Sequence, residues 1–190
     1  MKTFLFSLWL ATAALVQAAP GEYSAKTASG TTAADVIFAG DPLAPIRLVS
    51  LDVKSDLSSS KLVARSGREL FTLSANATNA TNFVLQSTSG LASNNVVVFQ
   101  RKSDNAVFKG TVWSVPNGTN LNLASSITAT FVTGDQLYLM TNNVSIDIGA
   151  ATVRQTGEAL FLAARSRPLL LSLDGTSACI INNAVANYGP

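Results

Sequence analysis

The stretch NVVVFQRKSDNAVFKGTVWSV, residues 95–115, contains two apolar runs separated by the polar sequence SDN. Valine, phenylalanine, threonine and tryptophan favour extended strands, because branched and aromatic side chains pack well on a pleated surface. Each run has the length of an ordinary strand, and Ser, Asp and Asn are typical of the turns between strands. The stretch therefore predicts two β-strands separated by a turn.

The same pattern of short apolar runs and turn residues continues through most of the chain. We expect strands at residues 35–39, 46–53, 69–74, 82–87, 95–101, 106–115, 127–132, 136–141, 144–148, 159–164, 168–173 and 179–182. Only residues 55–66, SDLSSSKLVARS, also suit a short helix behind a serine cap. Many short strands at this spacing predict an all-β fold, either an antiparallel β-sandwich or a partly open barrel.

Two parts of the sequence are similar to each other. TNFVLQS (81–87) followed by NNVVVF (94–99) is similar to TNLNLAS (119–125) followed by GDQLYLM (134–140). One explanation is an internal duplication, in which each unit offers one apolar face and the two faces cover each other. Chance similarity between strands rich in Thr and Asn is the other explanation.

This order of strand, loop, Gly-Asp pair and strand resembles units in β-rich structural and adhesive modules of bacterial surface proteins and of phage tail or fibre proteins. The resemblance covers residues 81–140, and the first unit departs from it, because Asn94 and Asn95 stand where the second unit has Gly134 and Asp135. The resemblance implies a structural or adhesive role, and it assigns no functional residue.

Residues 1–18, MKTFLFSLWLATAALVQA, have the layout of a secretion signal, with Lys2 first, then an apolar segment, then the small residue Ala18. The apolar segment is shorter than the roughly 20 residues that a membrane-spanning helix needs. We therefore expect cleavage after Ala18 or Ala19, no transmembrane helix in the product, and a secreted, periplasmic or cell-surface location.

The remaining chain divides into a short linker and one domain. Residues 19–34 are small and polar, which is typical of a flexible linker, and we expect residues 35–190 to form a single β domain. Charged residues make up 13% of the chain, against about 25% in an average protein. Lys and Arg occur in pairs at most, so we expect no nucleic-acid partner.

The chain contains one cysteine, Cys179, and no histidine. A single cysteine cannot form a disulfide within the chain, and without histidine a Ser-His-Asp or Cys-His catalytic site is excluded. Two interpretations of Cys179 remain. It is either an unpaired thiol in the core, within an apolar strand, or one end of a disulfide to a second chain.

The acidic residues give little support to an enzyme or a metal site. Glycoside hydrolysis by two carboxylates stays formally open, but no spacing in the sequence singles out a pair. Asp135 and Asp174 lie in turn sequences, where calcium ligands occur, yet neither belongs to an Asp-rich loop. Turn formation is the favoured role of both residues. We expect a protein that is not an enzyme and has no metal site and no cofactor.

Trp113 and Tyr138 are the candidate ligand-binding residues, because sugar-binding proteins normally stack exposed aromatic rings on the apolar faces of sugars. Trp113 shares a strand face with Lys109 and Thr111, which is the more polar face. Tyr138 lies opposite the face taken by its two leucine neighbours, so we expect it to be half exposed. A lone tryptophan in a β domain is more often part of the core, and that alternative stays open.

Together these features predict an exported, non-enzymatic structural or adhesive β-domain protein that contacts itself, other surface proteins or glycans. The alternative is a carbohydrate-binding module that uses Trp113. A small outer-membrane β-barrel is a third hypothesis, but the continuously apolar runs at 96–99 and 168–173 differ from the alternation that its strands require.

Four Asn-x-Ser/Thr patterns, the acceptor motif for N-glycosylation, occur in the chain. Chains rich in Asn, Ser and Thr produce several such patterns by chance. We expect each of them at or near a turn, and they are Asn76, Asn79, Asn117 and Asn143.

Overall fold

The computed structural model describes residues 21–25, 35–55, 61–147, 152–174 and 179–188. Strands dominate these residues, and no helix occurs among them, so the predicted all-β fold is confirmed. The predicted signal peptide, residues 1–18, lies outside the described part of the chain.

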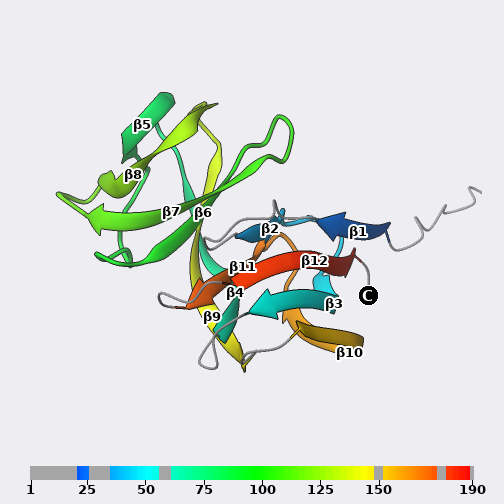
Figure 1. Cartoon of the computed structure of the whole chain (residues 1–190). Helices are drawn as coiled ribbons and strands as arrows, with labels where there is room; N and C mark the ends of the chain where they lie inside the picture. The colour runs from blue at the N-terminus through cyan, green and yellow to red at the C-terminus, as the bar shows by residue number, and fades with distance from the viewer. Residues whose placement is uncertain (1–20, 26–34, 56–60, 148–151, 175–178, 189–190) are drawn as a thin grey trace, which may run out of the picture.

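The strands form two antiparallel sheets (Figure 1). The smaller sheet has the order β1-β12-β3-β10, with the bounds β1 Gly21–Ala25, β12 Cys179–Tyr188, β3 Ile46–Ser55 and β10 Thr152–Ala163. The larger sheet has the order β2-β11-β4-β9-β6-β7-β8-β5. Its bounds are β2 Val36–Phe38, β11 Leu169–Asp174, β4 Lys61–Thr72, β9 Gln136–Asp147, β6 Val96–Gln100, β7 Val107–Ser114, β8 Asn120–Phe131 and β5 Ala77–Val84.

The long strands β4 and β9 run through both halves of the molecule (Figure 1). The first part of β4 and the last part of β9 lie in one sheet with β2 and β11. Side chains of β2, β4 and β11 share a core with the smaller sheet, and we call this region the sandwich half. Residues 67–141 form a strongly curled half-barrel, which we call the barrel half. The pairing of β4 with β9 shifts register between Ser66 and Glu69, where the two halves meet.

Each half buries its own apolar cluster. In the sandwich half, Leu48, Leu51 and Val53 of β3 are buried in one cluster with side chains of β4, β11 and β12. The register shift between Leu48 and Ser50 in the pairing with β12 allows Leu48 and Leu51, three residues apart, to join the same cluster. Such side chains each stabilise the fold by about 1.5–3 kcal/mol when fully buried. The rest of this cluster consists of Val36, Phe38, Ile46, Leu62, Ala64, Ala163, Leu169, Leu171, Ile181, Ala184, Ala186 and Tyr188.

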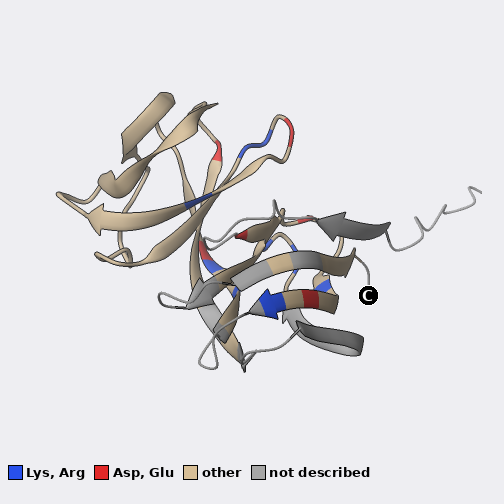
Figure 2. Cartoon of the chain, viewed as in Figure 1, with Lys and Arg blue, Asp and Glu red and all other residues tan. Residues whose placement is uncertain are grey.

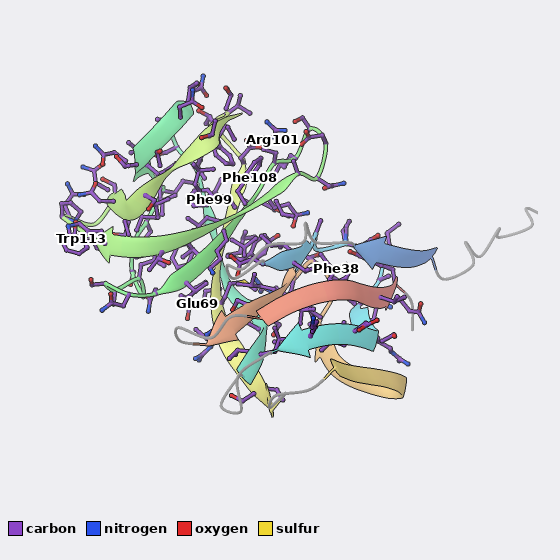
Figure 3. The ribbon with its side chains drawn as sticks, in the orientation of Figure 1. Phe38, Glu69, Phe99, Arg101, Phe108 and Trp113 are labelled. Atoms are coloured by element: carbon purple, nitrogen blue, oxygen red, sulfur yellow. The ribbon has the colours of Figure 1, made fainter. Side chains whose placement is uncertain are left out.

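Aromatic rings pack together among the aliphatic side chains of the barrel core, and Figure 3 labels two of them, Phe99 and Phe108. The ring centroid of Phe99 lies 4.5 Å from that of Phe83 and 5.2 Å from that of Phe131. Phe108 meets Phe131 edge to face, with the ring centroids 5.4 Å apart. Aromatic pairs in this arrangement add about 0.5–1.5 kcal/mol to the effect of burial alone. The half-barrel therefore has a well-packed interior of its own.

The two similar sequence units occupy equivalent places in the barrel half. β5 pairs with β8 so that Phe83 lies opposite Leu121, its counterpart in the other unit. β6 pairs with β9 so that Val98 lies opposite Tyr138, again its counterpart. Each strand thus meets its own equivalent in antiparallel fashion, which is the relation that a twofold axis produces.

The turns that lead into β6 and β9 are equivalent as well. Asn94 and Gly134, which correspond in the two units, both have left-handed backbone, with φ of 67° and 94°. The side chains of Asn95 and Asp135 each accept a hydrogen bond from the backbone N–H three residues earlier, at 2.7 and 2.9 Å. The Asn95 carbonyl accepts from the Val112 N–H, and the Asp135 carbonyl accepts from the Leu73 N–H, both at 2.9 Å. Registers and turns together support the duplication predicted from the sequence.

Several predicted elements differ in the structure. The helix allowed for residues 55–66 is wrong over 61–66, which belong to β4, because Leu62 and Ala64 alternate into the sandwich core. The linker prediction is wrong for Gly21–Ala25, which forms β1 and pairs with β12, whereas residues 26–34 lie outside the described chain. The separate strands predicted at 136–141 and 144–148 are the single strand β9.

Candidate functional site

Trp113 stands outward from the barrel half, near the outer end of β7 (Figure 3). Gly110 and Val112 of β7 are buried. Trp113, the penultimate residue of the strand, is 68% exposed. Val112 lies opposite Leu123 of β8, and Ser114 lies opposite the adjacent residue Asn122. Trp113 is therefore the extra residue of a β-bulge. Bulges of this kind re-aim a side chain and are frequent beside binding sites.

One hydrogen bond holds the Trp113 carbonyl, and another holds the side chain of the residue that follows it. Ser93 donates from its hydroxyl to the carbonyl oxygen of Trp113 at 2.7 Å. Asn122 of β8 donates from its amide nitrogen to the hydroxyl oxygen of Ser114 at 3.0 Å. We call these four residues the Trp113 platform. The platform combines an exposed apolar ring with hydroxyl and amide groups that lie beside its backbone.

The surroundings of the platform carry no charge. Residues 70–100 and 110–134, which form most of the barrel half, contain no Lys, Arg, Asp or Glu. Figure 2 shows this outer part of the barrel half free of charged residues, in contrast to the region where the two halves meet. A ligand at Trp113 would therefore meet polar but neutral groups.

Tyr138, the second predicted binding residue, is buried, and the expectation of half exposure is wrong. Only 1% of the residue is exposed. Its hydroxyl donates to Oε1 of Gln136 at 2.8 Å, and the Arg167 guanidinium lies 5.8 Å from the ring centroid. Burial raises the pKa of Tyr138, and the charge of Arg167 opposes that shift. Tyr138 is therefore not exposed for ring stacking as Trp113 is, although it lines one of the cavities described below.

Tyr138 is buried because both faces of β9 are covered. Leu137 and Leu139 face the barrel core, as the alternation predicts. The opposite face of the strand is covered too, because Tyr138 packs with Val98, Met140 and Leu170 in a third apolar cluster. Alternation along a strand separates its two faces but does not show whether the second face meets water.

The other residues singled out in the sequence are placed as follows. Cys179 begins β12, and its backbone pairs with Ser55 of β3; its side chain is outside the described part, so both interpretations stay predictions. Asp135 is 2% exposed and accepts from the N–H groups of Lys102 and Val132 at 3.0 and 2.9 Å, which confirms its role in the turn. Asp174 ends β11. Among the described residues, no group of His, Cys, Asp and Glu could hold a metal ion.

The glycosylation patterns agree only in part with the turn prediction. Asn76 and Asn117 lie in loops and are exposed. The Asn117 side-chain oxygen accepts from the N–H groups of Thr119 and Asn120 at 2.9 and 2.8 Å, as in an Asx turn. Asn79 and Asn143 lie within β5 and β9, so the turn prediction is wrong for these two.

A hollow that the sequence did not indicate lies where the two halves meet. Two adjoining cavities, of about 140 and 190 Å³, share the lining residues Gly40, Pro42 and Asn105; we call them the junction trough. The buried side chain of Gln100 fixes one wall: its Oε1 accepts from the Gly40 N–H, and its Nε2 donates to the Gly40 carbonyl, both at 2.9 Å. Gln100 thus joins the loop after β2 to the barrel half.

The backbone at the trough is strained. Asn105 and Ser166 both have left-handed backbone, with φ of 57° and 59°, which is uncommon for residues other than glycine. Such strain is frequent at ligand sites, where the surrounding structure holds it. Here the Ser166 N–H donates to the Asp41 carbonyl at 2.7 Å. Gly40 has to be glycine, because a Cβ there would lie 2.7 Å from the carbonyl carbon of Ser166.

Comparison of the chain with known proteins finds no matching protein family, no similar curated protein and no similar solved structure. Within the described residues, no helix is long and apolar enough to cross a membrane.

Proposed function

We propose that the chain is an exported, non-enzymatic adhesive β-domain that binds neutral carbohydrate through the Trp113 platform. The observation that carries this proposal is the exposure of Trp113. Tryptophan is buried on average, so an indole that is 68% exposed on a bulge leaves a large apolar area in water. A ligand that covers the ring removes this apolar area from water, which is favourable. The secretion signal predicted at residues 1–18 supports export.

The chemistry of the platform suits a sugar. The apolar C–H face of a pyranose stacks on an indole ring, while its hydroxyl groups need partners that both donate and accept. Ser93, Ser114 and Asn122 supply hydroxyl and amide groups beside the backbone of Trp113. Because residues 70–100 and 110–134 contain no charge, neutral sugars suit this surface better than acidic ones.

Assembly by strand addition is the other route by which an adhesive or structural β-domain joins partners, and the sheet edges do not favour it. β1 and β2 are edge strands of only five and three residues. The edge strands β5 and β10 are longer, but their pairings contain register shifts. Short or bulged edges are the usual protection against strand addition. Contact through side chains, as at Trp113, is therefore the favoured mode.

A glycan array probed with the secreted protein, followed by tryptophan fluorescence titration, tests the proposal. We expect one class of neutral glycans to bind and to change the emission of Trp113. The Trp113→Ala variant should lose array binding, whereas Trp113→Tyr should keep part of it because a phenol ring also stacks. Raising the salt concentration should leave the affinity nearly unchanged, because no charge is involved.

The matched control is Val132→Ala, which shortens another exposed apolar side chain of the barrel half. This variant should bind like the parent protein. If Trp113→Ala binds every glycan as well as the parent does, or if no neutral glycan binds the parent, the carbohydrate proposal is wrong and the structural alternative gains.

A further inference from the structure

The junction trough offers mainly hydrogen-bond donors at its larger cavity, because its own contacts occupy the acceptors. The Tyr138 hydroxyl donates to Oε1 of Gln136, which leaves the Gln136 amide N–H groups for another partner. Gln100 donates from Nε2 to Oδ1 of Asn105 at 3.3 Å, which likewise leaves the Asn105 amide donors. Acceptors are needed to complement such a wall.

Positive charge lies at the same end of the trough. Lys102 lines the larger cavity, and its ammonium has no ion-pair partner among the described residues. Arg167 lies over the ring of Tyr138, which also lines the cavity, and its buried Nη1 has no hydrogen-bond partner in the described chain. The nearby carboxylate of Asp135 is already bonded to two backbone N–H groups. The larger cavity therefore favours an anion.

The smaller cavity, at the opposite end of the trough, offers a negatively charged hydrogen-bond acceptor. Asp41 lines the smaller cavity, and its Oδ1 accepts from the Leu43 N–H at 2.7 Å. The other carboxylate oxygen, Oδ2, makes no described contact and is available to accept from hydroxyl groups. A molecule with a carboxylate at one end and hydroxyl groups at the other complements both cavities. Each cavity is smaller than the roughly 300–1,000 Å³ of sites for drug-sized ligands, so a single sugar unit is the suitable size.

We infer that the junction trough is a second ligand site, separate from the Trp113 platform, that binds a carboxylate-bearing sugar unit of the uronate type. Lys102 and the Gln136 amide hold the carboxylate, and Asp41 accepts from the sugar hydroxyl groups. The bidentate contact of Gln100 with Gly40 keeps the two walls in place before the ligand arrives. The inference does not depend on carbohydrate binding at Trp113.

Calorimetric titration of the full chain with galacturonate and glucuronate tests the site, with glucose, galactose and acetate as comparison ligands. We expect the uronates to bind with Kd near or below about 1 mM. The Lys102→Gln variant should weaken binding about tenfold or more, since it removes a charge-assisted hydrogen bond. In Gln136→Glu a carboxylate oxygen replaces the amide donors while the Tyr138 contact can remain, so binding should be lost.

Two controls separate these effects from general changes of charge or stability. Lys54→Gln removes an exposed lysine from β3 and should leave uronate binding unchanged. Thermal unfolding of all variants confirms that they fold, and Trp113→Ala should bind uronate like the parent. Equal binding of glucose and uronate would overturn the anion argument, and acetate binding as tight as uronate would overturn the sugar. No uronate binding to the folded parent would overturn the site.

Discussion

The barrel half and the sandwich half each bury an apolar cluster, but the chain builds the two halves in different ways. The barrel half comes from one continuous stretch, residues 67–141. The sandwich half joins segments from both ends of the described chain, since β1 pairs with β12 and β3 pairs with both β10 and β12. Closing such long loops has an entropic cost that local contacts avoid.

Because the two halves share β4 and β9, we expect one half to depend on the other. The first part of β4 pairs with the last part of β9 only when the chain between them has returned to the same place, and that chain is the barrel half. The sandwich half therefore depends on the barrel half, whereas the strands of the barrel half find their partners within their own stretch, apart from the ends of β4 and β9 that they share. Burial of an apolar cluster therefore does not by itself make a half of the molecule independent.

The largest expected effect comes from Phe99→Ala, at the centre of the aromatic cluster. Removal of a fully buried phenylalanine should lower the free energy of unfolding by about 3–5 kcal/mol. Hydrogen exchange should rise in both halves, because the sandwich half depends on the barrel half. Leu51→Ala in β3 is the matched change, and it should raise exchange in the sandwich half while the barrel amides stay protected. Loss of protection in the barrel half of Leu51→Ala would refute the proposed direction.

Gly40→Ala should break the junction between the halves. The added Cβ would meet the backbone of Ser166 and Arg167 at 2.7 to 2.8 Å, and backbone atoms cannot move aside cheaply. We expect a loss of about 3 kcal/mol in denaturant unfolding, at the upper end of the range for overpacking. Gly118→Ala, where a Cβ would meet no atom within 4 Å, should change stability by less than about 0.5 kcal/mol. Equal stability of both variants would contradict the packing at the junction.

Asp135→Ala and Asn95→Ala compare the two units within the barrel half. Both remove a side chain that accepts from a backbone N–H in equivalent turns. Asp135 also accepts from Lys102 N–H and is buried, so its loss should cost about 2 kcal/mol, against about 1 kcal/mol for Asn95. Chemical denaturation measures both values. A larger cost for Asn95 would show that the two turns are not equivalent in energy.

The smallest effect is expected for the ion pair between the halves. Lys109 of β7 donates to both carboxylate oxygens of Asp35, each at 2.9 Å. Both side chains are partly exposed, so Lys109→Met should cost less than about 1 kcal/mol. The difference from the parent should shrink as salt is added. If the free energy of unfolding of the variant falls by several kcal/mol, the ion pair, and not the contact of Gln100 with Gly40 at the junction trough, is the main link between the halves.

Local patterns in the sequence accounted for much of this molecule. Branched and aromatic residues at alternate positions predicted where most strands lie, and turn residues such as those at 133–135 predicted some of their ends. The strands β4, β8, β10 and β12 nevertheless extend about six to eight residues beyond the predicted ranges. Similar spacing in two segments predicted the duplication that pairs Phe83 with Leu121. Alternation in β7 also placed Trp113 on the face opposite Val112. Each of these properties depends only on neighbours in the chain.

Tertiary structure alone decided what covers each face and which distant residues meet. Tyr138 obeys the same alternation as Trp113, yet it is buried, because Val98 and Leu170 cover the second face of β9. The junction trough joins Gly40 to Gln100 and Asn105, which no sequence spacing brings together. The sequence determines the two faces of a strand through the geometry of the backbone, but exposure depends on the next layer of the fold, which comes from elsewhere in the chain.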